Sequence, residues 1–138
     1  MIEEDEVEFP RIETATDCCG RLRRFTVDLL TTDGGYFLRA QEDAPDGTGY
    51  RFAAHSEASP YLALGRLRQR IREGLATRYL SFEDGTRHLG HDVAVGTIGF
   101  GSLLIDGQEI PFDEFLMILQ SYEGWQFSLR IADLYDAL

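Results

Sequence analysis

The stretch "RHLGHD" contains the residues of this chain that are best suited to acid–base or metal chemistry. It supplies His88, His91 and Asp92, and imidazole nitrogens and carboxylate oxygens bind metals and carry protons. Gly90 separates the two histidines, however, and the surrounding residues are typical of a hairpin and a loop. We therefore favour a surface or core-edge role for this stretch and expect no bound metal or cofactor. An enzyme that uses His88, His91 and Asp92 is the less favoured alternative.

The sequence offers no anchor for nucleophilic catalysis. It contains no Gly-x-Ser-x-Gly turn of the kind that exposes a reactive serine. The two cysteines, Cys18 and Cys19, are adjacent and follow an acidic segment, which disfavours a reactive thiolate. Two neighbouring thiols do not make a disulfide framework, so we expect reduced, structural cysteines in the cytoplasm.

The segment 60–80 is strongly basic within an acidic chain, with five arginines and one glutamate. On a helix, Arg66 and Arg70 share a face opposite the apolar stripe, and Arg68 and Arg72 form a second pair on its flank. Arginine binds phosphate well, which makes this helix one candidate for nucleic-acid contact. The formal net charge of −11 opposes that contact. We therefore favour arginines that point outward and meet acidic groups of the same chain or of a partner.

The acidic charge is concentrated near the N-terminus. Residues 1–20 include the acidic run "EEDE" at positions 3–6, and we expect a solvated N-terminal extension there. A short edge strand around Val7 to Ile12 is the alternative. The remainder is predicted to be a single α+β domain over residues 21–138, with a division into halves 21–80 and 81–138 left open.

The chain has neither of the sequence features that direct a protein to a membrane. No segment approaches the roughly 20 consecutive apolar residues needed to span a bilayer. The N-terminal residues lack the basic region and the apolar run of a signal peptide. We expect a cytoplasmic protein without a membrane partner.

Alternating apolar residues predict three strands and a helix in the first half. The stretches "RFTVDLL", "YFLRA" and "YRFAAH" place apolar side chains at every second position, and "TTDGG" joins the first two as a hairpin. Ser59 is a suitable N-cap and Pro60 a suitable first helical residue. The apolar stripe of the helix comprises Leu64, Leu67, Ile71 and Leu75.

Turn and helix signals alternate in the second half. "LSFEDGTRHL" predicts a hairpin around Asp84-Gly85, and the glycine-rich stretch "GHDVAVGTIGFGS" predicts a strand with a bulge. Asp106-Gly107 predicts a second tight hairpin. A helix should then bury the face formed by Phe112, Phe115, Leu116 and Leu119. Gly124 should end this region, before a strand that packs Trp125, Phe127, Leu129 and Ile131 against the helix.

These elements give an α+β fold, with an N-terminal β-β-β-α half followed by hairpins and a C-terminal β-β-α-β unit. The motifs Ile105-Asp106-Gly107, Glu109-Ile110, Glu114-Phe115 and Glu123-Gly124-Trp125-Gln126-Phe127 resemble the C-terminal portion of a family of uncharacterised bacterial proteins. The likeness covers Gly99 to Asp133 and implies a shared fold element without a known activity. Pro111 stands where the family has a small N-cap residue, which leaves the start of the helix open.

The β-β-β-α order with a basic helix is also similar to the partial double-stranded-RNA-binding fold of HicB-type antitoxins. That likeness lies in element order alone and implies a partner toxin. We interpret the chain as a small protein that binds another macromolecule, either a second copy of itself or a protein partner. The alternatives are the enzyme described above and nucleic-acid or toxin binding through Arg66, Arg68, Arg70 and Arg72.

Overall fold

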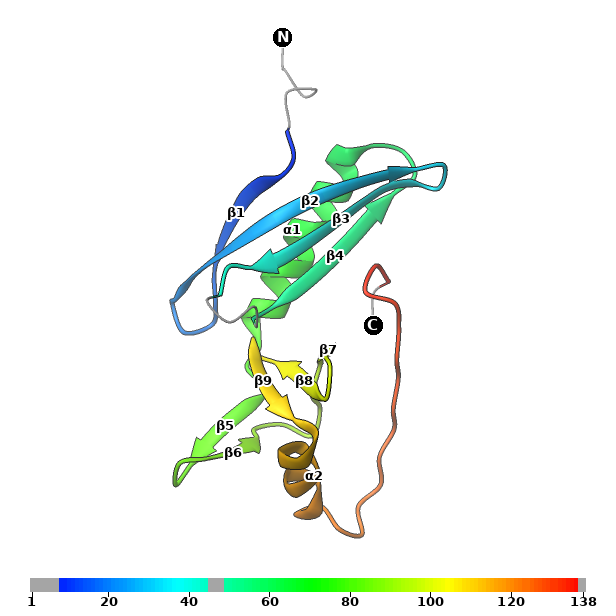
Figure 1. Cartoon of the computed structure of the whole chain (residues 1–138). Coiled ribbons are helices and arrows are strands. Elements are labelled where there is room, and N and C mark those ends of the chain that lie inside the picture. Colours follow the sequence, from blue (N-terminus) through cyan, green and yellow to red (C-terminus); the bar gives the residue numbers. More distant parts are fainter. Residues whose placement is uncertain (1–7, 45–48, 137–138) are drawn as a thin grey trace.

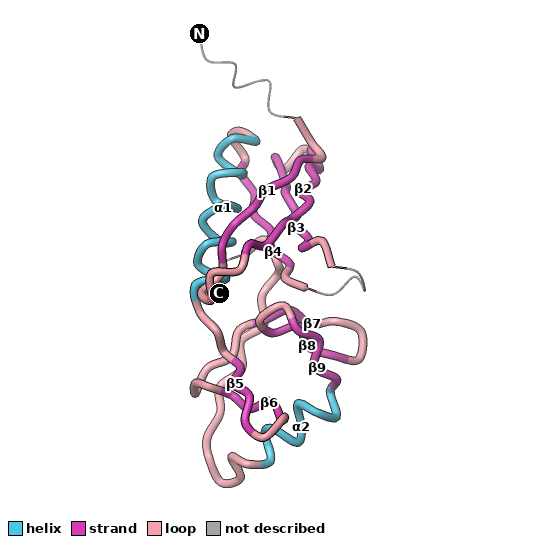
Figure 2. The backbone as a smooth tube through the Cα atoms, turned by 90° about the vertical axis from the view of Figure 1, so that its left-hand side faces the viewer, coloured by secondary structure: helices cyan, strands magenta, loops and turns pink. Residues whose placement is uncertain are grey.

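The computed structural model describes residues 8–44 and 49–136 of the 138-residue chain. The acidic run at positions 3–6 lies outside the described residues. The fold is mixed α+β, as the sequence predicts, and every strand pairing in it is antiparallel. Its two halves lie end to end, with the larger sheet and its helix at one end of the molecule (Figures 1 and 2).

The first half is a four-stranded sheet with one helix packed on one face (Figure 1). In spatial order the strands are β1 (Arg11–Thr16), β2 (Leu22–Thr32), β3 (Gly35–Glu42) and β4 (Arg51–Ser56), followed by helix α1 (Pro60–Ala76). The sequence predicts the last three strands and the helix. Strand β1 overlaps the alternative edge strand only at Arg11 and Ile12 and extends beyond it, with Arg11 to Thr16 paired to β2 in register from Arg11–Val27 to Thr16–Leu22. This part of the expected extension therefore belongs to the sheet.

Alternation along the strands builds the first core. Phe25, Val27 and Leu38 are fully buried on the face of the sheet that α1 covers. The predicted stripe of α1 is also buried, and it comprises Leu64, Leu67, Ile71 and Leu75. Ser59 caps the helix as expected, since its hydroxyl accepts a hydrogen bond from the backbone N–H of Leu62 at 3.1 Å. Burial of this stripe, rather than helix propensity, accounts for most of the stability of α1.

The second half consists of a hairpin, a three-stranded sheet and a short helix. The elements are β5 (Leu80–Glu83), β6 (Thr86–Leu89), β7 (Gly96–Ile98), β8 (Ser102–Ile105), β9 (Gln108–Pro111) and α2 (Phe112–Gln120). Both predicted Asp-Gly turns are confirmed: Asp84 and Asp106 have φ of 52° and 55°, and the glycines after them also have positive φ. Helix α2 starts directly after Pro111, which makes no side-chain capping bond.

The two halves touch at the β8–β9 turn. A Cβ atom on Gly107 would lie 2.9 Å from the ring of Tyr50, so only glycine lets this turn approach the first half so closely. Gly74 likewise allows close packing inside the first half, because a Cβ atom at this position would overlap the ring of Phe52. Among the described residues, no helix is both long enough and apolar enough to cross a bilayer.

The predicted final strand is wrong. Residues 125–131 contain no assigned strand, and the chain runs in extended form along the outside, from α2 back to the first sheet (Figure 1). We call residues 121–136 the C-terminal strap. Its alternation is that of a half-buried strand, but no strand of the described chain lies beside it. The expected packing against α2 is therefore also absent.

Candidate interaction site

Tyr135 attaches the end of the strap to the first sheet. The guanidinium of Arg70 donates to its carbonyl at 2.7 Å, and Nε of Arg39 donates to its hydroxyl at 2.9 Å. The Tyr135 ring meets that of Phe37 edge-on, with centroids 5.2 Å apart. Arg39 and Phe37 lie on the face of β3 that α1 does not cover. The strap is thus held at both ends, by α2 and by β3, while its middle stands free.

The middle of the strap exposes a row of large apolar side chains. Trp125 is 67% exposed, Phe127 90%, Leu129 74% and Ile131 68%. Its backbone is equally free: between positions 125 and 131 the only backbone hydrogen bond to another described residue joins Trp125 N–H to Tyr122. A strand with one apolar face and no pairing partner loses both hydrophobic burial and ladder bonds, so this arrangement is typical of a segment that pairs with another chain.

Helix α2 adds to this apolar surface. Only Ile118 of its residues is buried, while Leu116 is 61% and Met117 75% exposed. Phe115 is half-buried against the small core of Leu80, Ile105 and Ile110. Covering the large apolar side chains of the strap and of α2 would remove on the order of 800 Å² from water. That is about the area that one partner contributes to a stable protein–protein interface.

The free edge of β4 is closed by arginines of α1. Arg66 donates to the carbonyl of His55 at 2.8 Å, and Arg70 donates to that of Ala53 at 2.6 Å. One helical turn from Arg66 to Arg70 rises about 6 Å, which matches the two-residue repeat of an edge strand. Within the described part of the chain these two arginines therefore bind backbone carbonyls rather than acidic groups, and a contact with acids of a partner stays a prediction. Their guanidinium groups occupy backbone carbonyls of β4 that could otherwise accept hydrogen bonds from another strand.

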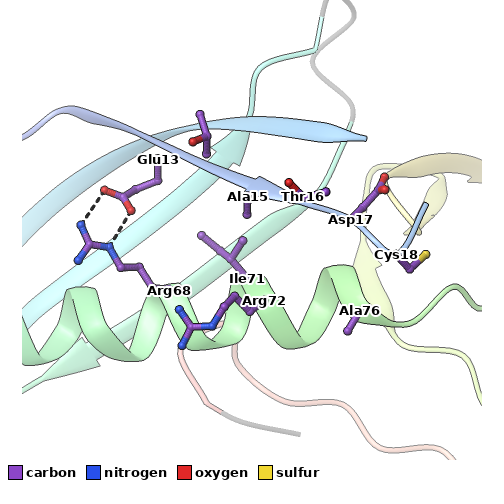
Figure 3. Close-up of a pocket in the computed structure, with 10 residues that line it drawn as sticks. Glu13, Ala15, Thr16, Asp17, Cys18, Arg68, Ile71, Arg72 and Ala76 are labelled. Atoms are coloured by element: carbon purple, nitrogen blue, oxygen red, sulfur yellow. Dashed lines mark hydrogen bonds and ion pairs between the residues drawn. The ribbon is translucent and has the colours of Figure 1, made fainter. Parts of the chain in front are cut away.

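The opposite edge of the sheet, β1, is open. Its second side carries no backbone bond to another described strand, and a groove of about 780 Å³ separates it from α1 (Figure 3). Ala15, Ile71 and Ala76 give this groove an apolar lining, with Arg68 and Arg72 along the helix side. The sheet thus has one closed edge and one accessible edge with a groove beside it.

Arg68 and Glu13 form an ion pair across this groove (Figure 3). Two nitrogens of the guanidinium, Nε and Nη2, donate to the two carboxylate oxygens at 2.7 and 3.1 Å. The hydrogen bond and the charge of Arg68 hold the pKa of Glu13 below its ordinary value. Arg72 also lines the groove, and no hydrogen bond or ion pair joins its guanidinium to another described residue. Of the four arginines singled out from the sequence, Arg72 is therefore the one whose guanidinium no other described residue engages.

The histidine stretch does not assemble a site. His88 lies on β6 opposite Ser81, and His91 and Asp92 are exposed in the turn that follows. The ring of His91 meets Tyr79 edge-on at 6.3 Å. Within residues 8–44 and 49–136, no group of three or more His, Cys, Asp or Glu residues is placed to hold a metal ion.

The adjacent cysteines are exposed free thiols with their sulfur atoms 3.7 Å apart. Arg78 lies 3.5 Å from the sulfur of Cys19. Desolvation, together with the neighbouring thiol, raises the pKa of Cys18. This favours the protonated, less nucleophilic form of Cys18.

Two residues with a positioning role escape sequence analysis. Asp106 fits a hairpin turn, yet its carboxylate, 7% exposed, also accepts the backbone N–H groups of Tyr79 at 2.9 Å and Leu80 at 2.7 Å. It thereby fastens the start of the second half to the β8–β9 turn. Tyr135 carries no motif at all. Only its place beside Arg39 and Arg70 reveals its role.

The comparisons with known proteins divide the chain where the fold does. Residues 7–76 match the family described as a domain of unknown function, DUF7686, and residues 79–136 match a second domain of unknown function, DUF7713. The boundary falls between α1 and β5. No curated protein and no solved structure matches the chain. The first match covers half of the chain, and the protein therefore belongs to the DUF7686 family.

Proposed function

We propose that this protein is an interaction module that associates with a second copy of itself, and that the strap and α2 supply the contact. The single observation that carries the proposal is the middle of the strap. Its seven alternating residues, 125–131, lie between two attached ends, and their apolar side chains are 67–90% exposed. A monomer gains nothing from exposing these side chains, whereas an interface buries them.

The alternatives find less support. Nucleic-acid binding through the helix needs free guanidinium groups, but Arg66, Arg68 and Arg70 are engaged within the chain. The formal net charge of −11 also repels the phosphate backbone of a nucleic acid. An enzyme needs a convergent group of reactive side chains, and His88, His91 and Asp92 lie along a hairpin end rather than around a cavity lined by all three.

We place this activity in a bacterial cytoplasm. The adjacent cysteines are free thiols, which persist in a reducing compartment. The resemblance of residues 99–133 to a family of bacterial proteins supports a bacterial origin.

Sedimentation at several protein concentrations tests the proposal. We expect a concentration-dependent dimer for the native chain, and a dissociation constant at least about tenfold higher for Phe127→Asp, since exposed aromatic side chains at an interface are frequent hot spots. Phe82→Asp is the matched control, because Phe82 is also exposed, at 57%, but lies on β5 away from the strap. The proposal is wrong if the native chain stays monomeric at every concentration. If Phe127→Asp associates as tightly as the native chain, the strap is not part of the contact.

A further inference from the structure

We infer that the open edge of β1 and its groove accept the strap of a second copy, which adds to the four-stranded sheet as a fifth strand. This inference rests on the proposed self-association and identifies where the strap goes. An exposed edge strand with an adjoining groove is a known receptor for extended peptide: main-chain hydrogen bonds supply affinity and the groove receives alternate side chains.

The length and availability of the sheet edges favour β1. The alternating part of the strap covers seven residues, from 125 to 131, and β1 has six. At about 3.3 Å per residue both span roughly 20 Å. Strands β7 and β9, the edges of the smaller sheet, have three and four residues. Strand β4 has six, but Arg66 and Arg70 already bind its outward carbonyls.

The strap of the same chain is held away from this edge. Tyr135 is anchored on β3 and bonded to Arg70 beside β4, and the sheet order puts β4 and β1 at opposite edges. Three strand spacings of about 4.8 Å separate those edges. A strap that reached β1 of its own sheet would have to give up the Tyr135 contacts, whereas the strap of a second copy need not. Reciprocal exchange then gives a closed two-fold dimer.

The chemistry of the groove matches the strap. The apolar side chains at alternate positions of the strap need an apolar lining with room above it, and Ala15, Ile71 and Ala76 provide one. Arg72 lies on the helix side of the groove without a hydrogen-bond or ion-pair partner among the described residues. The strap carries Glu123, an exposed acid, just before its apolar row. An arginine on the helix side of the groove and an acid on the incoming strand favour a pairing in which these two charges meet.

Amide hydrogen exchange of the native protein, followed below and above the dissociation constant of the dimer, tests this inference. In an antiparallel edge strand every second N–H points away from the sheet, so these amides of β1 are free in the monomer. We expect them to become protected on dimerisation, together with the amides of residues 125–131. Exchange that slows in the strap but not in β1 overturns the inference and leaves the proposed self-association standing. If no dimer forms, both fail.

A groove-filling substitution gives an independent measurement. Ala76→Trp places a large ring in the groove, and we expect its dimer dissociation constant to rise at least about tenfold. Ala58→Trp is the control: Ala58 is also exposed but precedes α1, roughly 25 Å away at 1.5 Å per helical residue. Circular dichroism of both variants checks that the fold is kept. Ala76→Trp that folds and dimerises like Ala58→Trp contradicts the use of the groove.

Discussion

Arg70 and Tyr135, 65 positions apart in the sequence, are joined by a hydrogen bond of 2.7 Å from the guanidinium to the backbone carbonyl. The same guanidinium nitrogen donates to Ala53 at 2.6 Å. One side chain therefore both closes the edge of β4 and holds the end of the strap. Because the arginine is half-buried, these charge-assisted bonds are worth more than those of an exposed ion pair.

Replacing Arg70 by Met should release the end of the strap. We expect the free energy of unfolding to fall by about 1.5–3 kcal/mol, the range for hydrogen bonds to a charged group. Limited proteolysis should then cut residues 121–136 faster, because their attachment to the first sheet is weakened. Arg72→Met, compared at protein concentrations below the dissociation constant of the dimer, is the matched control, since Arg72 lies on the same helix without such bonds to described residues. Equal cleavage rates in the two variants would show that Arg70 does not hold the strap.

Asp106 should matter for stability far beyond its place in a turn. Asp106→Ala leaves the N–H groups of Tyr79 and Leu80 without their acceptor, and we expect a loss of about 2–4 kcal/mol in chemical denaturation. Asp84→Ala is the control, because Asp84 has nearly the same φ, 52° against 55°, in an exposed hairpin. The difference between the two variants isolates the hydrogen bonds from the backbone strain. If they lose equal stability, the carboxylate of Asp106 contributes nothing beyond the turn.

Truncating Phe25 and truncating Phe127 to alanine should have very different effects on the free energy of unfolding. Phe25 is completely buried, so Phe25→Ala should lower the free energy of unfolding by about 3–5 kcal/mol. Phe127 is 90% exposed, so Phe127→Ala should change the free energy of unfolding by less than about 0.5 kcal/mol when it is measured below the dissociation constant of the dimer. A loss of several kcal/mol at Phe127 in the monomer would mean that the strap packs on its own chain after all.

The Glu13–Arg68 pair predicts a pH dependence. The folded-state pKa of Glu13 lies below its ordinary value of 4.5, so the pair stabilises the fold above that pH and the contribution is lost as the pH falls through the folded pKa. Glu13→Gln should therefore be less stable than the native chain at neutral pH, by about 1 kcal/mol or less. The difference should shrink to nothing in acid. Urea denaturation at several pH values measures it.

Glu83→Gln controls for the general loss of a negative charge in this experiment. Glu83 is exposed on β5 and makes no ion pair with a described residue. A stability difference for Glu13→Gln that persists unchanged in acid would show that its cause is not the ionised carboxylate.

Local signals in the sequence were sufficient for most elements. The Ser59 cap, the stripe of α1 and the two Asp-Gly turns are determined by neighbours a few residues away, and all are confirmed. The alternative edge strand around Val7 to Ile12 reaches only the first two residues of β1, because the nearby acidic run and Pro10 obscure a strand whose own Ile12, Thr14 and Thr16 favour an extended chain. The pairing of β1 with β2 decides that this segment is a strand rather than a solvated extension.

The strap shows this limit most clearly. By its alternation alone, the sequence determined that residues 125–131 prefer an extended chain with one apolar face. Whether that face is covered depends on where a strand edge lies in space, and only the tertiary structure decided that none lies beside it. The same holds for Arg66 and Arg70: the helical repeat places them on one face, but the approach of β4 decides that they bind carbonyls instead of acids. Periodicity is a local property of the chain, whereas pairing is a property of the distances that folding creates.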